Sequence, residues 1–134
     1  MRLMRAIALT VLCAALCTTV LAQNHQSAAH HRAQTRTAGP YLLEMLADGD
    51  AVSIRVRDRA GTPVDTAGGK GKAVIHTDGR AVTIELHPVT PDVLSGRGHY
   101  RLKRSTVVYV TIDLKKARAQ RTVFRPLSES PPQP

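Results

Sequence analysis

Residues 41–64 read YLLEMLADGDAVSIRVRDRAGTPV and predict two β-strands joined by a tight turn. The Asp48-Gly49 pair is a strong hairpin signal, because a type I′ turn requires a positive φ at both central residues. With that loop, Met45 lies opposite Val52, and directly opposed residues of an antiparallel pair share a face. The register therefore places one apolar row on the inner face, consisting of Tyr41, Leu43, Met45, Val52, Ile54 and Val56.

Two later segments repeat this pattern. A second Asp-Gly turn at Asp78-Gly79 pairs Ile75 with Val82, and the apolar row of residues 107–114 faces a returning strand that ends at Phe124. Short strands separated by turn residues, with no helical period, are typical of an antiparallel β-sandwich. We predict an all-β fold, a single antiparallel immunoglobulin-like β-sandwich of about seven short strands, spanning residues 39–126.

The first 22 residues differ from this domain. Arg2 and Arg5 precede an uncharged run of 17 residues from Ala6 to Ala22, which is the pattern of a secretory signal peptide. A membrane anchor is the alternative, but about 20 apolar residues are needed to span a bilayer. We therefore expect cleavage after Ala22 and a periplasmic or secreted mature protein without a transmembrane segment.

Cysteine content and charge narrow the function classes. Cys13 and Cys17 both lie in the predicted signal, so the mature chain can form no disulfide, thiolate nucleophile or cysteine-based metal site. Cleavage leaves 17 basic and ten acidic residues, a net charge of +7, which favours anionic partners. Nucleic acid is not expected outside the cytoplasm, and an aromatic content of 3% offers few side chains for stacking on bases.

The segments that flank the domain are polar and lack periodicity. Residues 23–38 predict a disordered, histidine-containing leader, and residues 127–134 predict a disordered tail. Within the domain, His76 and His87 are expected about 20 Å apart along a strand. Together with His99, they are predicted to be solvated surface residues.

The leader holds the candidate metal ligands. Cleavage after Ala22 would leave Gln23, Asn24 and His25 at the amino terminus. The α-amine, two backbone amides and the imidazole then offer four nitrogens in a plane, an arrangement that suits Cu(II) and Ni(II). The sequence predicts one such ion, with His30 and His31 as auxiliary ligands. The alternative is that His25 is a solvated tail residue, and cyclisation of an N-terminal glutamine would remove the amine.

Basic residues are concentrated in the last third of the chain. They could form a patch that binds a polyanion or a membrane surface. The alternative is that they are the solvated charges of loops, outward strand positions and strand edges. The candidate patch consists of Arg97, Arg101, Lys103, Arg104, Lys115, Lys116, Arg118, Arg121 and Arg125.

Residues 58–68, DRAGTPVDTAG, resemble the D-x-x-G-x-P-V pattern of transthyretin-like and related immunoglobulin-like bacterial modules. The stretches TIELHPV and VVYVTIDL extend the resemblance over Gly39 to Phe124, where the chain is similar to small periplasmic domains associated with heavy-metal efflux adaptors. Those modules often follow a histidine-rich leader. The resemblance implies a periplasmic sandwich and a link with metal homeostasis. The helical hairpin and lipoyl-like segment of the adaptors are missing from the sequence, so the transport role does not carry over.

Catalytic motifs are not found in the sequence. It contains no G-x-S-x-G elbow, no H-E-x-x-H pair and no phosphate-binding glycine loop, so we do not expect an enzyme. We predict a secreted periplasmic binding protein, an accessory in copper or other divalent-metal homeostasis or efflux, with a metal-efflux or other periplasmic protein as partner. The alternative is a non-catalytic structural or protein-interaction module that docks on an anionic partner or surface.

Overall fold

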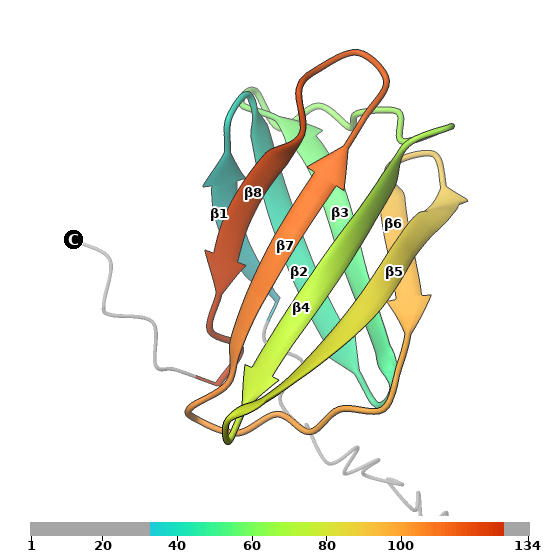
Figure 1. Ribbon diagram of the computed structural model, residues 1–134. Coiled ribbons are helices and arrows are strands. Elements are labelled where there is room, and N and C mark those ends of the chain that lie inside the picture. Colours follow the sequence, from blue (N-terminus) through green and yellow to red (C-terminus); the bar gives the residue numbers. More distant parts are fainter. Residues whose placement is uncertain (1–32, 128–134) are drawn as a thin grey trace, which may run out of the picture.

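The computed structural model describes residues 33–127, which form eight antiparallel strands (Figure 1). None of these residues belongs to a helix that could cross a membrane. The strands are β1 (Gln34–Ala38), β2 (Tyr41–Asp48), β3 (Ala51–Asp58), β4 (Lys70–Thr77), β5 (Arg80–Thr90), β6 (Val93–Arg97), β7 (Val107–Asp113) and β8 (Gln120–Phe124). The predicted all-β antiparallel class is confirmed.

The strands form one sheet instead of the predicted sandwich of seven strands. Their order is β1-β2-β3-β6-β5-β4-β7-β8, and the sheet curls until β1 and β8 lie side by side (Figure 1). The eighth strand is β1, which lies within the segment predicted to be a disordered leader. That boundary was wrong, because residues 34–38 extend the open edge of β2, with Gln34 opposite Met45. Residues 23–32 of the leader lie outside the described part of the chain.

The long strand β5 joins the two halves of the barrel. Its first part pairs with β4, whereas His87 to Thr90 pair with β6 across a register shift between Pro88 and Thr90. Proline lacks a donor for the ladder and is tolerated at such a bulge, where the strand bends. The strand therefore continues through Pro88 and carries the sheet around a corner.

A side chain completes the barrel between β1 and β8. The amide of Gln34 donates to the Arg125 carbonyl (2.6 Å) and accepts from the Arg125 backbone N–H (3.1 Å). Gln34 is only 5% exposed, and its two hydrogen bonds imitate the pairing of one peptide group with another. The barrel is therefore closed at this point by a side chain where a strand ladder would otherwise be needed.

The hairpins place the expected residues inside. At Asp78-Gly79 both φ angles are positive (51° and 73°), and Ile75 pairs with Val82 as predicted. In the first hairpin the loop is Gly49-Asp50, since Asp48 pairs with Ala51 and Met45 pairs with Ile54. This register is shifted by two residues from the predicted one. Because side chains alternate with a period of two, the predicted inward row is still the buried one.

The core fills the barrel with side chains from every strand. Phe124 packs into the core from β8, opposite Val108. At the seam between β1 and β8 the buried inward residue Gln34 is polar. Burying an apolar side chain of this size contributes about 1.5–3 kcal/mol. The buried apolar residues are Ala38, Tyr41, Leu43, Met45, Val52, Ile54, Val56, Ala73, Ile75, Ile84, Leu86, Leu94, Val108, Val110, Ile112, Leu114 and Phe124.

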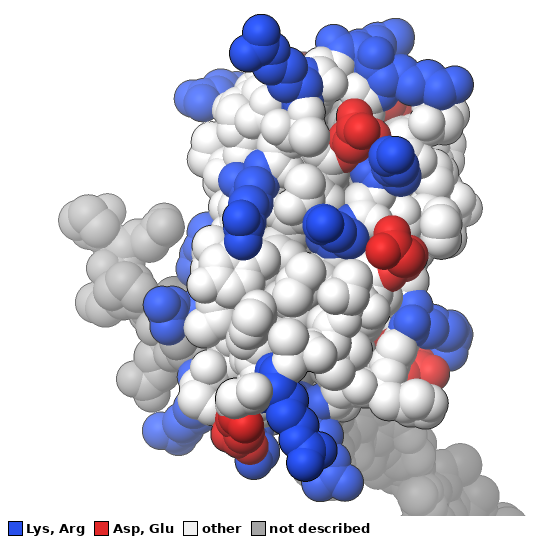
Figure 2. Space-filling model, viewed as in Figure 1, with Lys and Arg blue, Asp and Glu red and all other residues white. Residues whose placement is uncertain are grey.

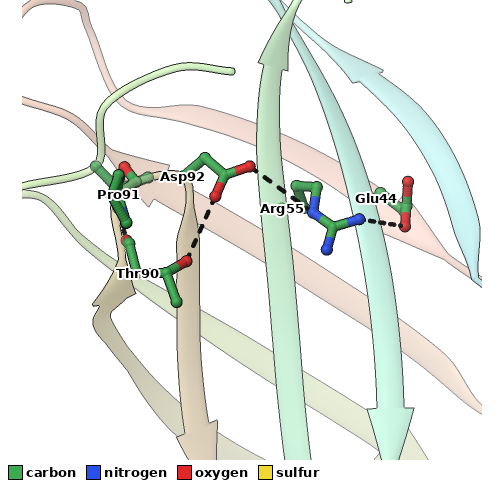
Figure 3. Close-up of polar contacts among 6 residues, drawn as sticks. Glu44, Arg55, Thr90, Pro91 and Asp92 are labelled. Atoms are coloured by element: carbon green, nitrogen blue, oxygen red, sulfur yellow. Dashed lines mark hydrogen bonds and ion pairs between the residues drawn. The ribbon is translucent and has the colours of Figure 1, made fainter. Parts of the chain in front are cut away.

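Polar contacts hold the β5–β6 turn against the rest of the barrel. On the outer face, Arg55 of β3 lies between Glu44 of β2 (3.4 Å) and Asp92 of the turn (3.8 Å), as Figure 3 shows. These pairs are partly exposed, and such pairs contribute at most about 1 kcal/mol. The backbone adds a bond from the Val56 N–H to the Asp92 carbonyl (2.8 Å). The buried Thr66 N–H donates to the Pro91 carbonyl (2.7 Å).

Candidate functional site

The predicted metal ligands Gln23, Asn24, His25, His30 and His31 lie outside the described residues. In the described part of the chain, β1 starts with Gln34, which pairs with Met45 near the end of β2. β1 therefore begins at the end of the barrel that carries the β2–β3 turn (Figure 1). Within residues 33–127 no three His, Cys, Asp or Glu side chains are grouped to hold a metal ion.

The three histidines of the barrel lie apart. His76 points outward from β4 and meets the Tyr109 ring edge-on, with 5.3 Å between the ring centroids. His87 is exposed on β5, and His99 follows β6 in a loop. All three are exposed, as the sequence predicted.

The predicted basic patch is divided between the two ends of the barrel and the face of β8. The loop between β6 and β7 carries Arg101, Lys103 and Arg104, just after Arg97 at the end of β6. Lys115, Lys116 and Arg118 lie in the next loop, beyond the seven residues of β7, a strand about 23 Å long. Figure 2 shows Lys and Arg at both ends of the visible face, with scattered ones between.

The other two cations of the predicted patch lie on or beside β8. Arg121 stacks over the outward-facing Tyr109 ring, 4.8 Å from its centroid. The backbone of Arg125 bonds to Gln34. The nine cations therefore do not form a single patch.

Four segments of the chain meet at one end of the barrel and enclose a half-open groove of about 890 Å³. They are the β2–β3 turn, the end of β4, the start of β5 and the loop after β6. The groove opens where β5 has left β6, because residues 80–86 of β5 pair with β4 alone. We call it the barrel-end groove. It is lined by Gly49, Asp50, Ile75, Thr77, Asp78, Arg80, Val82, Gly98, His99, Tyr100, Arg101 and Lys103.

Hydrogen bonds hold the loop that forms one wall of the groove. The Gly98 N–H donates to the Asp50 carbonyl (2.8 Å), and the Tyr100 hydroxyl donates to the Ala51 carbonyl (2.7 Å). Further along, the Lys103 N–H donates to the buried Thr106 hydroxyl (2.7 Å), which also bonds the Thr77 hydroxyl (2.8 Å). The wall is therefore tied to both neighbouring hairpins, which makes the groove a preformed feature of the fold.

Tyr100 is kept in its protonated form by its surroundings. Burial raises the pKa of its hydroxyl, and the negative charges of Asp48 and Asp50 raise it further. All three effects disfavour the phenolate. The hydroxyl therefore remains a donor to the Ala51 carbonyl throughout the physiological pH range, and it does not act as a base.

Both carboxylates that line the groove form ion pairs, whereas two of its arginines do not. Asp50 is paired with Arg97 (3.0 Å), and Asp78 is paired with Lys103. Arg80 and Arg101 also line the groove, and within residues 33–127 their guanidinium groups have no hydrogen-bond or ion-pair partner. With both carboxylates neutralised, the groove presents two cations and the His99 imidazole to a ligand.

The described residues that line the groove include no serine or cysteine, and their one lysine, Lys103, is paired with Asp78. Tyr100 is held as a hydrogen-bond donor. Comparison of the chain with protein-family models, curated proteins and solved structures gave no match.

The sequence indicated some of these residues and missed others. Arg101 and Lys103 were in the predicted patch, and His99 was predicted to be a solvated surface residue without a role. Arg80 and Tyr100 were missed. Because successive strands of this sheet run in opposite directions, strand parity places the two glycine turns and the loop after β6 at the same end, but only the curled sheet brings them around one groove.

Proposed function

We propose that this protein is a secreted, non-catalytic binding protein that captures an anionic group in the barrel-end groove. The observation that carries this proposal is the pair of guanidinium groups of Arg80 and Arg101, which line the groove while both of its carboxylates are paired elsewhere. Arginine presents a planar fork of donors that matches carboxylate and phosphate oxygens. Periplasmic location follows from the signal pattern and belongs to the same proposal.

A titration with inorganic phosphate and with acetate, at constant ionic strength, tests the anion site. We expect saturable amide shifts in residues 98–103 and around Arg80 in the ¹⁵N spectrum of the mature protein. The Arg80→Gln/Arg101→Gln double variant should bind at least about tenfold more weakly, since a hydrogen bond to a charged group contributes roughly 1.5–3 kcal/mol.

The matched control is Lys116→Gln/Arg118→Gln, which removes the same charge from the opposite end of the barrel. It should leave the affinity for both anions unchanged. An equal loss in the two double variants would show that the anions respond only to net charge, and the proposal for the groove would then be wrong.

A second proposal concerns the leader, and it is carried by the position of His25 third from the expected cleavage site. We propose that the mature amino terminus binds Cu(II) or Ni(II) through Gln23, Asn24 and His25. The chain would then serve as an accessory in metal handling, as its resemblance to modules associated with heavy-metal efflux implies. Imidazole and amide nitrogens suit the tetragonal preference of these ions.

Mass spectrometry of the secreted protein and a Cu(II) titration test the leader. We expect an amino terminus at Gln23, one Cu(II) per chain, and a loss of roughly tenfold or more in affinity for His25→Ala, because one of the four planar nitrogens is removed. His76→Ala, on the outer face of the barrel, serves as the control and should bind as the wild type does. Equal affinities of the His25→Ala and wild-type proteins would contradict the proposal.

A further inference from the structure

The floor of the barrel-end groove is apolar. Ile75 and Val82 are paired across β4 and β5 and belong to the inward row of the barrel. Val82 is only partly buried and packs against the core cluster. The partly buried Tyr100 packs on the same cluster from the loop wall. A ligand in the groove therefore contacts the last layer of the core.

Two cations without an ion-pair partner among the described residues, Arg80 and Arg101, lie at the rim of the groove. Arg80 begins β5 two residues before Val82, and Arg101 follows Tyr100 directly. Each arginine therefore lies within two residues of an apolar side chain of the groove, Val82 for Arg80 and the Tyr100 ring for Arg101. An apolar floor with a few convergent polar groups, in a volume of about 300–1,000 Å³, is the usual form of a small-molecule site. The 890 Å³ groove has that form.

We propose that the ligand is an amphipathic carboxylate, with its head group held by Arg80 and Arg101 and its short hydrocarbon chain lying on Val82, Ile75 and the Tyr100 ring. This inference rests on the proposed anion site and adds the apolar half of the ligand. Charge complementarity selects an anionic head group, because the acidic residues Asp50 and Asp78 are already paired, and a carboxylate fits the planar fork of an arginine. The apolar floor favours a ligand with a hydrocarbon chain over a compact inorganic anion.

Isothermal titration of the mature protein with acetate, butanoate, hexanoate and octanoate tests the inference without any substitution. Each methylene that leaves water for the floor should raise the affinity about fourfold, until the floor is covered. Octan-1-ol, which has the same chain without the charge, should bind much more weakly than octanoate. The heat capacity change on binding should become more negative with chain length, as expected for apolar burial.

Two single variants locate the chain. Val82→Thr keeps the shape of the side chain and adds a hydroxyl, so it should flatten the dependence on chain length while acetate binding persists. Val123→Thr makes the same change on the outer face of β8, where Val123 is 37% exposed, and should leave the series unchanged. Thermal unfolding of both variants verifies that they are folded at the titration temperature.

The outcomes separate the two proposals. Equal affinities across the series, with binding still lost in Arg80→Gln/Arg101→Gln, would overturn the amphipathic ligand and leave the anion site standing. Octan-1-ol binding as well as octanoate would overturn the role of the two arginines as the head-group site. Failure of acetate and octanoate to bind while inorganic phosphate binds would overturn the amphipathic carboxylate alone, and failure of all three would overturn both proposals.

Discussion

Gly96→Ala is expected to destabilise the barrel by about 3 kcal/mol, at the upper end of the cost of overpacking a core. Gly96 lies on β6 opposite Val52, on the inward face. A β-carbon at this position would overlap the backbone carbonyl oxygen of Glu85 and would lie 2.8 Å from Ile84 Cγ2. Because the first obstacle is backbone, it cannot be relieved by a change of rotamer, and β5 would have to move away from β6.

Urea unfolding of the mature protein measures this effect. Gly49→Ala is the control, because Gly49 has a φ of 57° and nothing within 4 Å of an added β-carbon. Its cost of about 1 kcal/mol comes from the left-handed backbone alone. A Gly96→Ala variant no less stable than Gly49→Ala would show that β5 and β6 are not in close contact, and the corner of the barrel would then be wrong.

Gln34→Ala is expected to cost about 2 kcal/mol, since it removes two partly buried hydrogen bonds to the Arg125 backbone, and a typical hydrogen bond contributes about 0.5–1.5 kcal/mol. The Gln34 amide supplies both hydrogen bonds across the seam between β1 and β8. We therefore expect faster hydrogen exchange at the Arg125 amide as well as a lower free energy of unfolding.

The neighbouring Thr35→Ala variant controls for changes within β1, because Thr35 is exposed and pairs only with Glu44. It should leave exchange at Arg125 unchanged. If Gln34→Ala altered neither the exchange of the Arg125 amide nor the stability, the side chain would not close the barrel.

The local hairpins were predictable because turn chemistry and alternation point to the same answer. At Asp78-Gly79 both central residues adopt positive φ, and the predicted pairing of Ile75 with Val82 is the one observed. At the first hairpin only Gly49 has a positive φ, so the loop moved to Gly49-Asp50. A shift of two residues leaves every side chain on its face, which is why the inward row was correct although the loop was not.

The strand β1 was not predictable from its own residues. Its inward positions include Gln34 and Arg36, so the segment lacks the apolar row by which the other strands were recognised. It becomes a strand because β2 offers an open edge and because Arg125 satisfies the buried Gln34 amide. Both partners are supplied by tertiary structure.

The residues of the groove could likewise be predicted only in part. Basic residues near its wall were noted in the sequence, but Lys115, Lys116 and Arg118 were grouped with them although they lie beyond β7 at the opposite end. Only the folded chain shows which charges are paired, as Asp50 and Asp78 are, and which line the groove without a partner.

The sequence by itself determined the all-β class, the three hairpins and the faces of their strands, because these depend on turn residues and on a period of two. The tertiary structure decided that the sheet closes into a barrel, that residues 34–38 join it and that the two glycine turns meet the loop after β6 around one groove. Those features arise from contacts between residues far apart in the chain, such as Gln34 with Arg125 and Gly96 with Glu85. The local sequence pattern does not indicate such contacts.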